Sequence, residues 1–417
     1  MNKQADSPGP DLEAARKKRR KARLATLLKT LLAALLLAWV ANGLPWTDTL
    51  RYIADPNKGA EVLSISGTIL GGWRENVVEF DVDATNSLDA AWPEDLRLAV
   101  QAGENLNLSR RGGDVAGYEW RPGMPRVFYD LHGSGLVAAF AGLLLGLFFG
   151  VTRWWRILRL ANCPSSWWNT LRFSSLGLFF NLVMPGLTGG DLPKALMVVR
   201  AHPERRADAL ATVVIDRLIG LWSLVLLACS VVWWRAGDWV VLQLPVTLAL
   251  VAMSMGMIFV LLPGPRRVLG FDRLIAKLPQ AARIQKLEQS ALLYRGRPGE
   301  LVISILLSLG NHISVVAAVY AIGTAFGTLL GFGAYVGVVS VANLITALPL
   351  SPGGWGVGEA AYGYLFEQMG AVATIGVAVS VTYRLCTVAL GLAGGLFMMM
   401  PGTAKMRDEV MRPDGDQ

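Results

Sequence analysis

The sequence predicts an all-α polytopic membrane protein with about six transmembrane helices, two oppositely oriented re-entrant hairpins and a small extracytoplasmic β-rich insertion. The first observation is composition: 53% of the 417 residues are hydrophobic and 17% are charged, whereas a soluble protein carries about a quarter charged residues. The second is that runs such as LATLLKTLLAALLLAWV approach the roughly 20 apolar residues that cross a bilayer. The third is that two apolar stretches are interrupted by Pro, Gly and acidic residues.

The basic residues are distributed unevenly along the chain, and their distribution indicates the topology. Residues 1–29 hold nine basic and three acidic groups, residues 151–206 hold eight and two, and residues 263–300 hold eight and three. Residues 42–131 hold eight basic and fourteen acidic groups. Because Lys and Arg collect in cytoplasmic loops, we expect the first three segments inside and the fourth outside. The net charge of +8 is thus a topology signal, and no nucleic-acid partner is expected.

Six apolar runs are expected to span the membrane, and two more to enter and return. The spans lie at about 24–41, 133–151, 208–234, 240–262, 300–325 and 371–399. The stretch 166–200 has basic segments on both sides, so it is expected to form a hairpin that turns within NLVMPGLTGGDLPKA. The stretch 333–369, broken by LPLSPGGWGVGEA, is the second hairpin and enters from outside. Eight full spans are the alternative, which places one basic flank outside.

Five parts follow in chain order. They are a basic cytoplasmic tail (1–23), a first transmembrane helix (24–41), an extracytoplasmic β-rich domain (42–131), the main transmembrane domain (132–400) and a cytoplasmic C-terminal tail (401–417). In the β-rich domain, EVLSISG and VVEFDVD alternate apolar and polar residues around the turn GGWREN. The segments LRLAVQ, LNLSRR and RVFYDL are predicted as further strands.

The two interrupted stretches resemble each other, which predicts an inverted repeat. Both follow the order NL, P, GG, RL: Asn181-Leu182, Pro185, Gly189-Gly190 and Arg217-Leu218 in the first, and Asn343-Leu344, Pro349, Gly353-Gly354 and Arg384-Leu385 in the second. Transporters built from inverted repeats place their binding site on broken helices near the middle of the membrane. Chance matches among many Leu and Gly residues are the alternative.

The first break carries the residue types of an anion site. Asp191 followed by Pro193 is typical of a helix N-terminus, whose free N–H groups and positive dipole end favour an anion. Lys194 lies one turn into this helix and adds a positive charge. Gly189 and Gly190 allow a ligand or another backbone to approach closely. In the second break, Gly353 and Gly354 have two interpretations: they contact the headgroup of a bound lipid, or they allow helices to pack tightly.

Arg217 and Arg384 are the most informative residues, because each is predicted near the middle of a span. A central Arg costs at least about 2.5 kcal/mol on insertion, so it faces the protein interior and marks a ligand or a path. A guanidinium binds phosphate through two parallel hydrogen bonds, which favours an anionic lipid headgroup. The alternative is a structural ion pair of each arginine with Asp191 or Glu359. Asp216 is adjacent to Arg217 but need not be its partner, because neighbours on a helix do not face each other.

Other chemistries find no support in the sequence. The three cysteines lie in or beside apolar segments at no metal-like spacing. Phosphate-binding loops with a lysine, HExxH and GxSxG are not found, so we expect neither ATP-driven transport nor hydrolysis by those chemistries. We therefore expect no metal, no cofactor and no catalytic residue. Asp81 and Asp83 resemble an acidic metal-binding pair, but on an alternating strand they form its exposed face.

At NLVMPGLTGGDLPKA, DRLIGL and SPGGWGVGEA, the chain resembles the lysylphosphatidylglycerol-synthase transmembrane family, also called flippase-like, over about 130–400. That family includes the membrane half of the multiple peptide resistance factor and proteins that handle polyisoprenoid, hopanoid or aminoacylated lipids. The positions that match its motifs are Gly190, Asp191, Arg217, Gly353, Gly354, Glu359 and Arg384. The chain ends at residue 417 without room for the cytosolic aminoacyl-transferase domain, so we expect no synthase activity.

The resemblance and the residues together predict a lipid translocator, flippase- or scramblase-like, of the bacterial inner membrane with a cytoplasmic N-terminus. It would handle an anionic or modified phospholipid or a polyisoprenoid-linked lipid. The residues expected to bind the headgroup are Arg217, Arg384, Lys194, Gly189, Gly190, Gly353 and Gly354, and those expected to form gating ion pairs are Asp191, Glu359 and Asp216. Two alternatives stay open: an accessory subunit of envelope biosynthesis that contacts a partner through the β-rich domain, and a membrane enzyme that transfers a group from a lipid carrier.

Overall fold

The structure is a computed structural model of the full chain. It describes residues 46–53, 62–83, 88, 92–110, 117–183, 191–234, 237, 239–261, 296–348, 350–351 and 354–399, with isolated positions between 31 and 42. The predicted first span, 24–41, lies outside the described residues apart from isolated helical positions. Both predicted tails also lie outside them.

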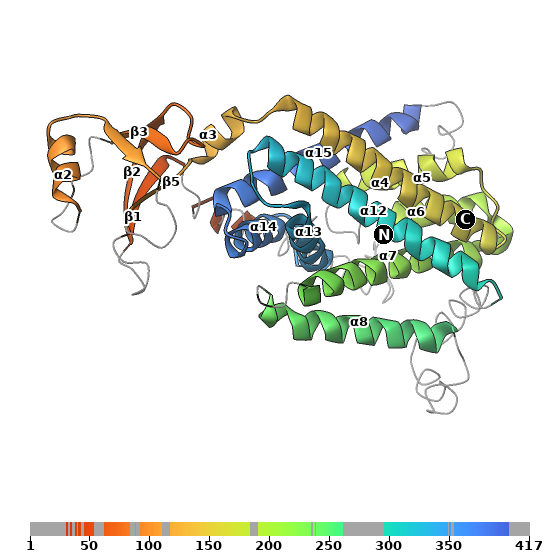
Figure 1. The fold of residues 1–417 in the computed structure, drawn as a ribbon. Helices are drawn as coiled ribbons and strands as arrows, with labels where there is room; N and C mark the ends of the chain where they lie inside the picture. Colours follow the sequence, from red (N-terminus) through yellow and green to blue (C-terminus); the bar gives the residue numbers. More distant parts are fainter. Residues whose placement is uncertain are drawn as a thin grey trace, which may run out of the picture.

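A β-sheet domain lies at one end of a bundle of helices (Figure 1). We call this end of the bundle the β-domain end and the opposite end the distal end. The helices are α4 (Gly133–Leu160), α5 (Trp167–Val183), α6 (Asp191–Ala201), α7 (Arg206–Trp234), α8 (Val240–Leu261), α12 (Pro298–Ala325), α13 (Phe332–Ala347), α14 (Val357–Gln368) and α15 (Ala373–Gly395). Single 3₁₀ turns, η1 (Pro203–Arg205) and η3 (Leu396–Met399), precede α7 and follow α15.

Five helices in the described part of the chain are long and apolar enough to cross a membrane. They are α4, α7 with its preceding turn, α8, α12 and α15, and they correspond to five of the six predicted spans. Helix α4 extends beyond the predicted second span, 133–151, to Leu160. Arg153, within this extension, is buried in the bundle.

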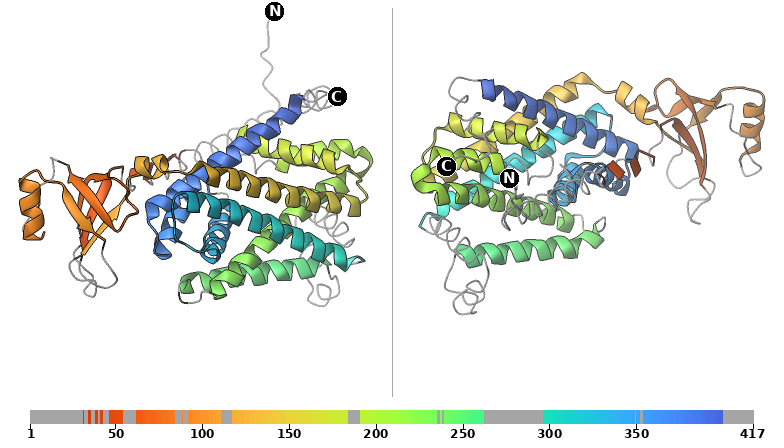
Figure 2. Two further views of the ribbon diagram at one scale, coloured as in Figure 1. Left: turned by 45° about the horizontal axis from the view of Figure 1, so that its top comes forward. Right: turned by 180° about the vertical axis from the view of Figure 1, so that it is seen from behind.

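The remaining helices form two pairs of short helices at opposite ends of the bundle. Helices α5 and α6 contact each other and lie toward the distal end, whereas α13 and α14 contact each other and lie toward the β-domain end (Figures 1 and 2). Each pair is followed in the chain by a long apolar helix, α7 after the first and α15 after the second. The predicted positions of both interruptions therefore coincide with breaks between short helices.

Helices α4 and α12 pack most closely, and small residues make this possible. A Cβ at Gly135 would lie 2.4 Å from the Ala325 Cβ, and one at Gly142 would lie 2.9 Å from the Ser314 carbonyl oxygen. Interfaces between membrane helices rely on such small residues because they let backbones approach without a hydrophobic driving force. These two helices form the wall behind the polar cavity described below.

The β-domain is a five-stranded antiparallel sheet in the order β4-β3-β2-β1-β5. Its strands are β1 (Asp48–Ile53), β2 (Val62–Leu70), β3 (Val77–Val82), β4 (Leu106–Ser109) and β5 (Gly117–Arg121). The predicted strands at EVLSISG, VVEFDVD and LNLSRR correspond to β2, β3 and β4. On β3, Phe80 is fully buried and Asp81 is exposed, which is the alternation read from the sequence.

Two predicted strands in this domain were wrong. LRLAVQ lies in helix α2 (Glu94–Gln101) and RVFYDL begins within helix α3 (Met124–Tyr129). Both segments follow helix-start signals that outweigh their β propensity: Glu94 and Asp95 occupy the first turn of α2, and Pro125 stands in the first turn of α3. Strands β1 and β5 had not been predicted. Their pairing, Asp48–Ile53 against Gly117–Arg121, joins segments far apart in sequence.

The β-domain contacts the bundle through polar groups. Arg121 on β5 lies 3.7 Å from Glu367 at the end of α14. The Arg74 side chain lies against Gly327 after α12, where the backbone has φ of +74°. The indole of Trp73 donates a 2.7 Å hydrogen bond to Asp130, just before α4. The sheet is thus attached to the end of the bundle that carries the α13–α14 pair.

Asp48 joins the sheet to the helix that leads into the bundle. Its carboxylate accepts hydrogen bonds from the backbone N–H groups of Ile69, at 2.9 Å, and Gly123, at 2.8 Å. Arg126 on α3 donates to the same carboxylate at 2.6 Å and to the Ile69 carbonyl at 2.5 Å. Asp48 is 6% exposed, so its charge depends on these donors and not on water.

We expect Asp48→Ala to destabilise the β-domain by about 3 kcal/mol, because it leaves Arg126 without its carboxylate and two buried N–H groups without an acceptor. Limited proteolysis of the detergent-solubilised full chain measures this as faster cleavage within the domain. Asp81→Ala, which removes an exposed carboxylate from β3, is the matched control. Equal protease resistance of the two variants would contradict the role given to Asp48.

Candidate functional site

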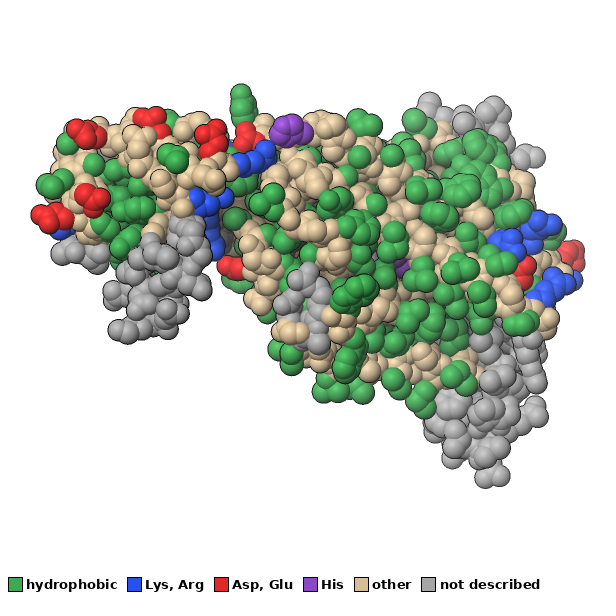
Figure 3. All heavy atoms as spheres, viewed as in Figure 1, with side chains coloured by type: hydrophobic (Ala, Val, Ile, Leu, Met, Phe, Trp, Pro, Cys, Tyr) green, Lys and Arg blue, Asp and Glu red, His purple; other side chains and the backbone are tan. Residues whose placement is uncertain are grey.

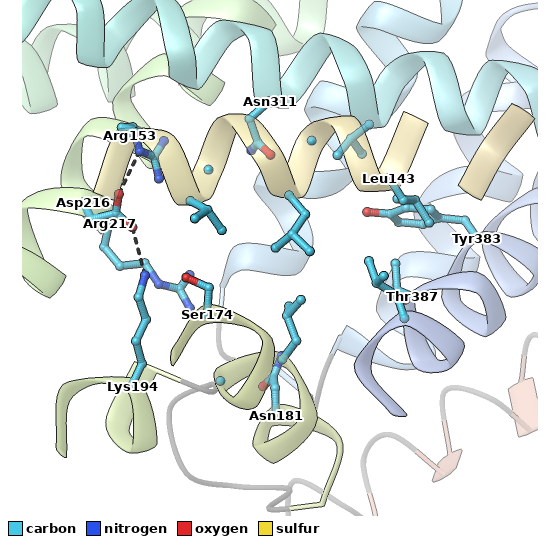
Figure 4. A pocket seen from close by; sticks show the side chains of 18 residues that line it. Leu143, Arg153, Ser174, Asn181, Lys194, Asp216, Arg217, Asn311, Tyr383 and Thr387 are labelled. Carbon is cyan, nitrogen blue, oxygen red and sulfur yellow. Dashed lines mark hydrogen bonds and ion pairs between the residues drawn. The ribbon is translucent and has the colours of Figure 1, made fainter. Parts of the chain in front are cut away.

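A polar cavity lies inside the bundle, between the α5–α6 pair and the wall formed by α4 and α12. Its volume is about 300 Å³, and α4, α5, α6, α7, α12 and α15 all contribute to its lining. Its polar side chains are Arg153, Ser174, Asn181, Lys194, Asp216, Arg217, Asn311, Tyr383 and Thr387 (Figure 4). Leucines, valines and glycines line the rest. The cavity thus combines polar groups on several helices with an apolar lining.

Three charged side chains from three helices meet at one side of this cavity. Asp216 on α7 accepts a 2.8 Å hydrogen bond from Arg153 Nε and lies 3.3 Å from Lys194 Nζ. Arg153 also donates to the Ser308 hydroxyl on α12 at 2.7 Å. The side chains of Arg153, Lys194 and Asp216 are 9%, 13% and 9% exposed, so this triad is enclosed by protein. Two cations therefore share one carboxylate in a buried place.

An aromatic ring holds Lys194 in position. Its Nζ lies 3.8 Å from the centre of the Trp154 ring, a cation–π contact. Trp154 is fully buried, and its indole N–H donates to the Thr212 hydroxyl on α7 at 3.2 Å. Lys194 is thereby held between Asp216, the Trp154 ring and the cavity.

Arg217 lines the same cavity and pairs with Asp191, the first residue of α6. The side chain of Arg217 is 63% exposed and that of Asp191 is 30% exposed. Arg217 lies about 16 Å along α7 from the start of this helix at Arg206. An exposed ion pair therefore lies well inside the length of an apolar helix.

Arg384 occupies a second, separate cluster, at the α13–α14 pair. Its Nε lies 2.5 Å from Glu359 Oε1, and its Nη2 donates to the Gly354 carbonyl at 2.5 Å. Glu359 also accepts the backbone N–H of Gly356 at 2.6 Å, which satisfies a free N–H at the start of α14. Glu359 is 1% exposed and Arg384 13%. The Trp355 ring covers the guanidinium, with 5.0 Å between the ring centre and Cζ.

The glycines of the second break make this cluster possible. Gly354 and Gly356 have φ of +71° and +79°, which side chains rarely adopt. A Cβ at Gly358 would lie 2.2 Å from Arg384 Nη2. These contacts favour the packing interpretation for this loop. Gly189, Gly190 and Gly353 lie outside the described residues.

The structure brings the predicted residues together only in part. Lys194, Asp216 and Arg217 share the cavity, with Asp191 beside it, whereas Arg384, Glu359 and Gly354 form the other cluster. The ion pairs considered for Arg217 and Arg384 are both present. Arg153 was missed as a site residue, because it follows the predicted span 133–151 and lies in the basic segment 151–206, which was expected to be cytoplasmic. One signal in the sequence pointed to burial: the segment ILRLANC, which is mostly apolar, follows shortly after Arg153.

The long apolar helices and the enclosed polar cavity define a multi-pass membrane protein. Within this class, the pattern of the lysylphosphatidylglycerol synthase TM region matches residues 124–395, well over half of the chain. The protein belongs to this family. The match confirms the resemblance found in the sequence and covers every helix of the bundle from α3 to α15. No curated protein and no solved structure matches the chain.

Proposed function

We propose that this protein moves lipids between the leaflets of a membrane by holding an anionic headgroup in the cavity. The observation that carries this proposal is the charge of the lining: three cations, Arg153, Lys194 and Arg217, face one carboxylate, Asp216, among the described residues. Even with Asp191 included, the cavity keeps an excess of one positive charge. Such a site favours a phosphate, which guanidinium and ammonium groups bind by charge-assisted hydrogen bonds.

The arrangement of the helix pairs supports a path across the membrane. In each half, an acidic residue in the first turn of the second short helix pairs with an arginine on the next long helix: Asp191 with Arg217, and Glu359 with Arg384. Both arginines lie about 16 Å along their helices. We take this correspondence as support for an inverted repeat of two re-entrant hairpins.

The surface charge supports the proposed orientation. On the face shown in Figure 3, most acidic side chains lie over the β-domain, and basic side chains lie at the distal end and where the β-domain meets the bundle. The surface between them carries many hydrophobic side chains. Because Lys and Arg collect on the cytoplasmic side, we place the distal end and the α5–α6 pair inside, and the β-domain outside, in the bacterial inner membrane.

The two ion pairs differ in exposure, as expected if each acts as a gate. In the pair on the α5–α6 side, the side chain of Arg217 is 63% exposed and that of Asp191 is 30% exposed. In the pair on the α13–α14 side, Arg384 is 13% exposed and Glu359 is 1% exposed. In this proposal the cavity is accessible from the distal side and closed toward the β-domain. Translocation then requires the reverse state, in which Glu359 and Arg384 separate and Asp191 and Arg217 are covered.

The test is reconstitution of the full chain in liposomes that contain fluorescent phosphatidylglycerol or phosphatidylcholine. The measured quantity is the rate at which label from the inner leaflet becomes accessible to an external quencher. We expect protein-dependent movement of the anionic lipid. Ser174→Trp, which fills the cavity from α5, should lower this rate at least tenfold, because the headgroup loses its space. Ser230→Trp, on the exposed face of α7, is the matched control.

Three results would contradict the proposal. Movement of neither lipid by folded wild-type protein would remove the translocator role and favour an accessory subunit. Conversion of the lipid to a product of different mass would favour a group-transfer enzyme. Equal rates for both tryptophan variants would show that lipid moves by a path other than the cavity.

A further inference from the structure

The charges enclosed with Lys194 do not balance when the cavity is empty. Arg153, Lys194 and Asp216 sum to one excess positive charge, and their side chains are 9%, 13% and 9% exposed. Asp216 is the hydrogen-bond partner of both cations. An unbalanced charge in a buried place is costly, and in a membrane protein it is more costly still. Two events remove the excess: an anion enters the cavity, or one cation loses its proton.

Lys194 is the cation that can lose its proton. A guanidinium stays charged in proteins, whereas an ammonium can become a neutral amine. The charged and titratable groups around Lys194 are Asp216 and Arg217 on α7, Arg153 on α4, Asp191 on its own helix and Tyr383 on α15. On α5, the polar groups that line the cavity are Ser174 and Asn181, which carry no charge.

Geometry gives Lys194 a route for the proton. Its Nζ contacts Asp216 on one side and the face of the Trp154 ring on another, and the side chain lines the cavity. The Arg217 side chain, on the same cavity wall, is 63% exposed, so packed side chains do not close the cavity at this point. We take this opening as the route by which a proton reaches or leaves Lys194.

We propose that Lys194 takes up one proton when an anionic headgroup enters the cavity and releases it when the headgroup leaves, so that the anionic lipid and a proton move together. This inference rests on the proposed function. With the neutral amine, the empty site has no net charge from the triad. With the ammonium and a singly charged phosphodiester, the loaded site is again neutral. Both states can thus be enclosed in the membrane, whereas a charged empty site is disfavoured.

The test is a pH gradient across the proteoliposome membrane, with the distribution of fluorescent phosphatidylglycerol between leaflets as the readout. For the wild type we expect the label to accumulate in the leaflet facing the higher pH. The limit of one-for-one coupling is about a tenfold leaflet ratio per pH unit, because one pH unit corresponds to about 1.4 kcal/mol per proton. Lys194→Arg keeps the positive charge, but its guanidinium does not release a proton. Whatever lipid exchange this variant retains at equal pH should show no accumulation of label when the gradient is applied, because its side chain stays charged.

Controls separate this inference from the proposed function. Arg200→Lys places an exposed, titratable lysine elsewhere on α6 and should leave the gradient response unchanged. Lipid exchange by wild type without any response to the gradient overturns proton coupling and leaves translocation intact. A gradient response that persists in Lys194→Arg also overturns the role of Lys194. Absence of exchange at every pH overturns the proposed function and this inference with it.

Discussion

Asp216→Ala is expected to lower the free energy of unfolding by about 4 kcal/mol, because it leaves both Arg153 and Lys194 buried without their carboxylate. Lys194 would lose its carboxylate partner and retain its contact with the Trp154 ring. We expect the transition temperature of the detergent-solubilised protein to fall by several degrees. Thermal unfolding of purified protein, followed by fluorescence-detected size exclusion, measures this fall.

Asp208→Ala is the matched control for this change. Asp208 lies on the same helix and pairs with Arg205, but its side chain is 39% exposed and that of Arg205 is 50%. Exposed pairs of this kind contribute about 0–1 kcal/mol, so this variant should unfold near the wild-type temperature. Equal transition temperatures for Asp216→Ala and wild type would show that the triad is not enclosed as described.

Arg217→Ala is expected to lower the rate of anionic lipid movement at least tenfold while changing stability by about 1 kcal/mol or less. The two effects separate because Arg217 lines the cavity but its side chain is 63% exposed. In the proposed function this guanidinium binds the headgroup phosphate as the lipid moves between leaflets, so its loss raises the barrier to movement, whereas an exposed ion pair adds little to folding. Flipping rates in liposomes and transition temperatures in detergent are measured on the same preparations.

Arg200→Ala is the control, since it removes an exposed arginine from α6 that does not line the cavity. Arg384→Ala tests the other half of the protein but combines two effects, because it leaves Glu359, 1% exposed, without its cation. Its flipping rate is therefore compared with that of Arg384→Lys, which retains the charge. Unchanged lipid movement in folded Arg217→Ala would remove the phosphate-binding role and leave its ion pair with Asp191 as structural.

The sequence was sufficient for the features that depend on local pattern. Runs of about 20 apolar residues predicted five helices found here, since a bilayer accepts little else. The breaks at NLVMPGLTGGDLPKA and LPLSPGGWGVGEA correctly placed two interruptions because clustered Pro and Gly residues disfavour a continuous helix. Alternation of apolar and polar residues predicted β2, β3 and β4, because successive side chains of a strand point to opposite faces of the sheet. Lys194, Asp216 and Arg217 were candidates because charge inside an apolar run needs an explanation.

The pairing of residues that are far apart in the sequence could be identified only from the tertiary structure. Strands β1 and β5 pair across a separation that no local pattern records. Arg153 had been assigned to a membrane surface, since a charged residue at the end of an apolar run is usually solvated there. Its carboxylate partner is 63 residues away, on another helix. The sequence by itself thus determined which segments enter the membrane, because that depends on summed hydrophobicity along the chain. Only the packed structure decided which charges are buried together and left in excess, because that depends on distances between helices.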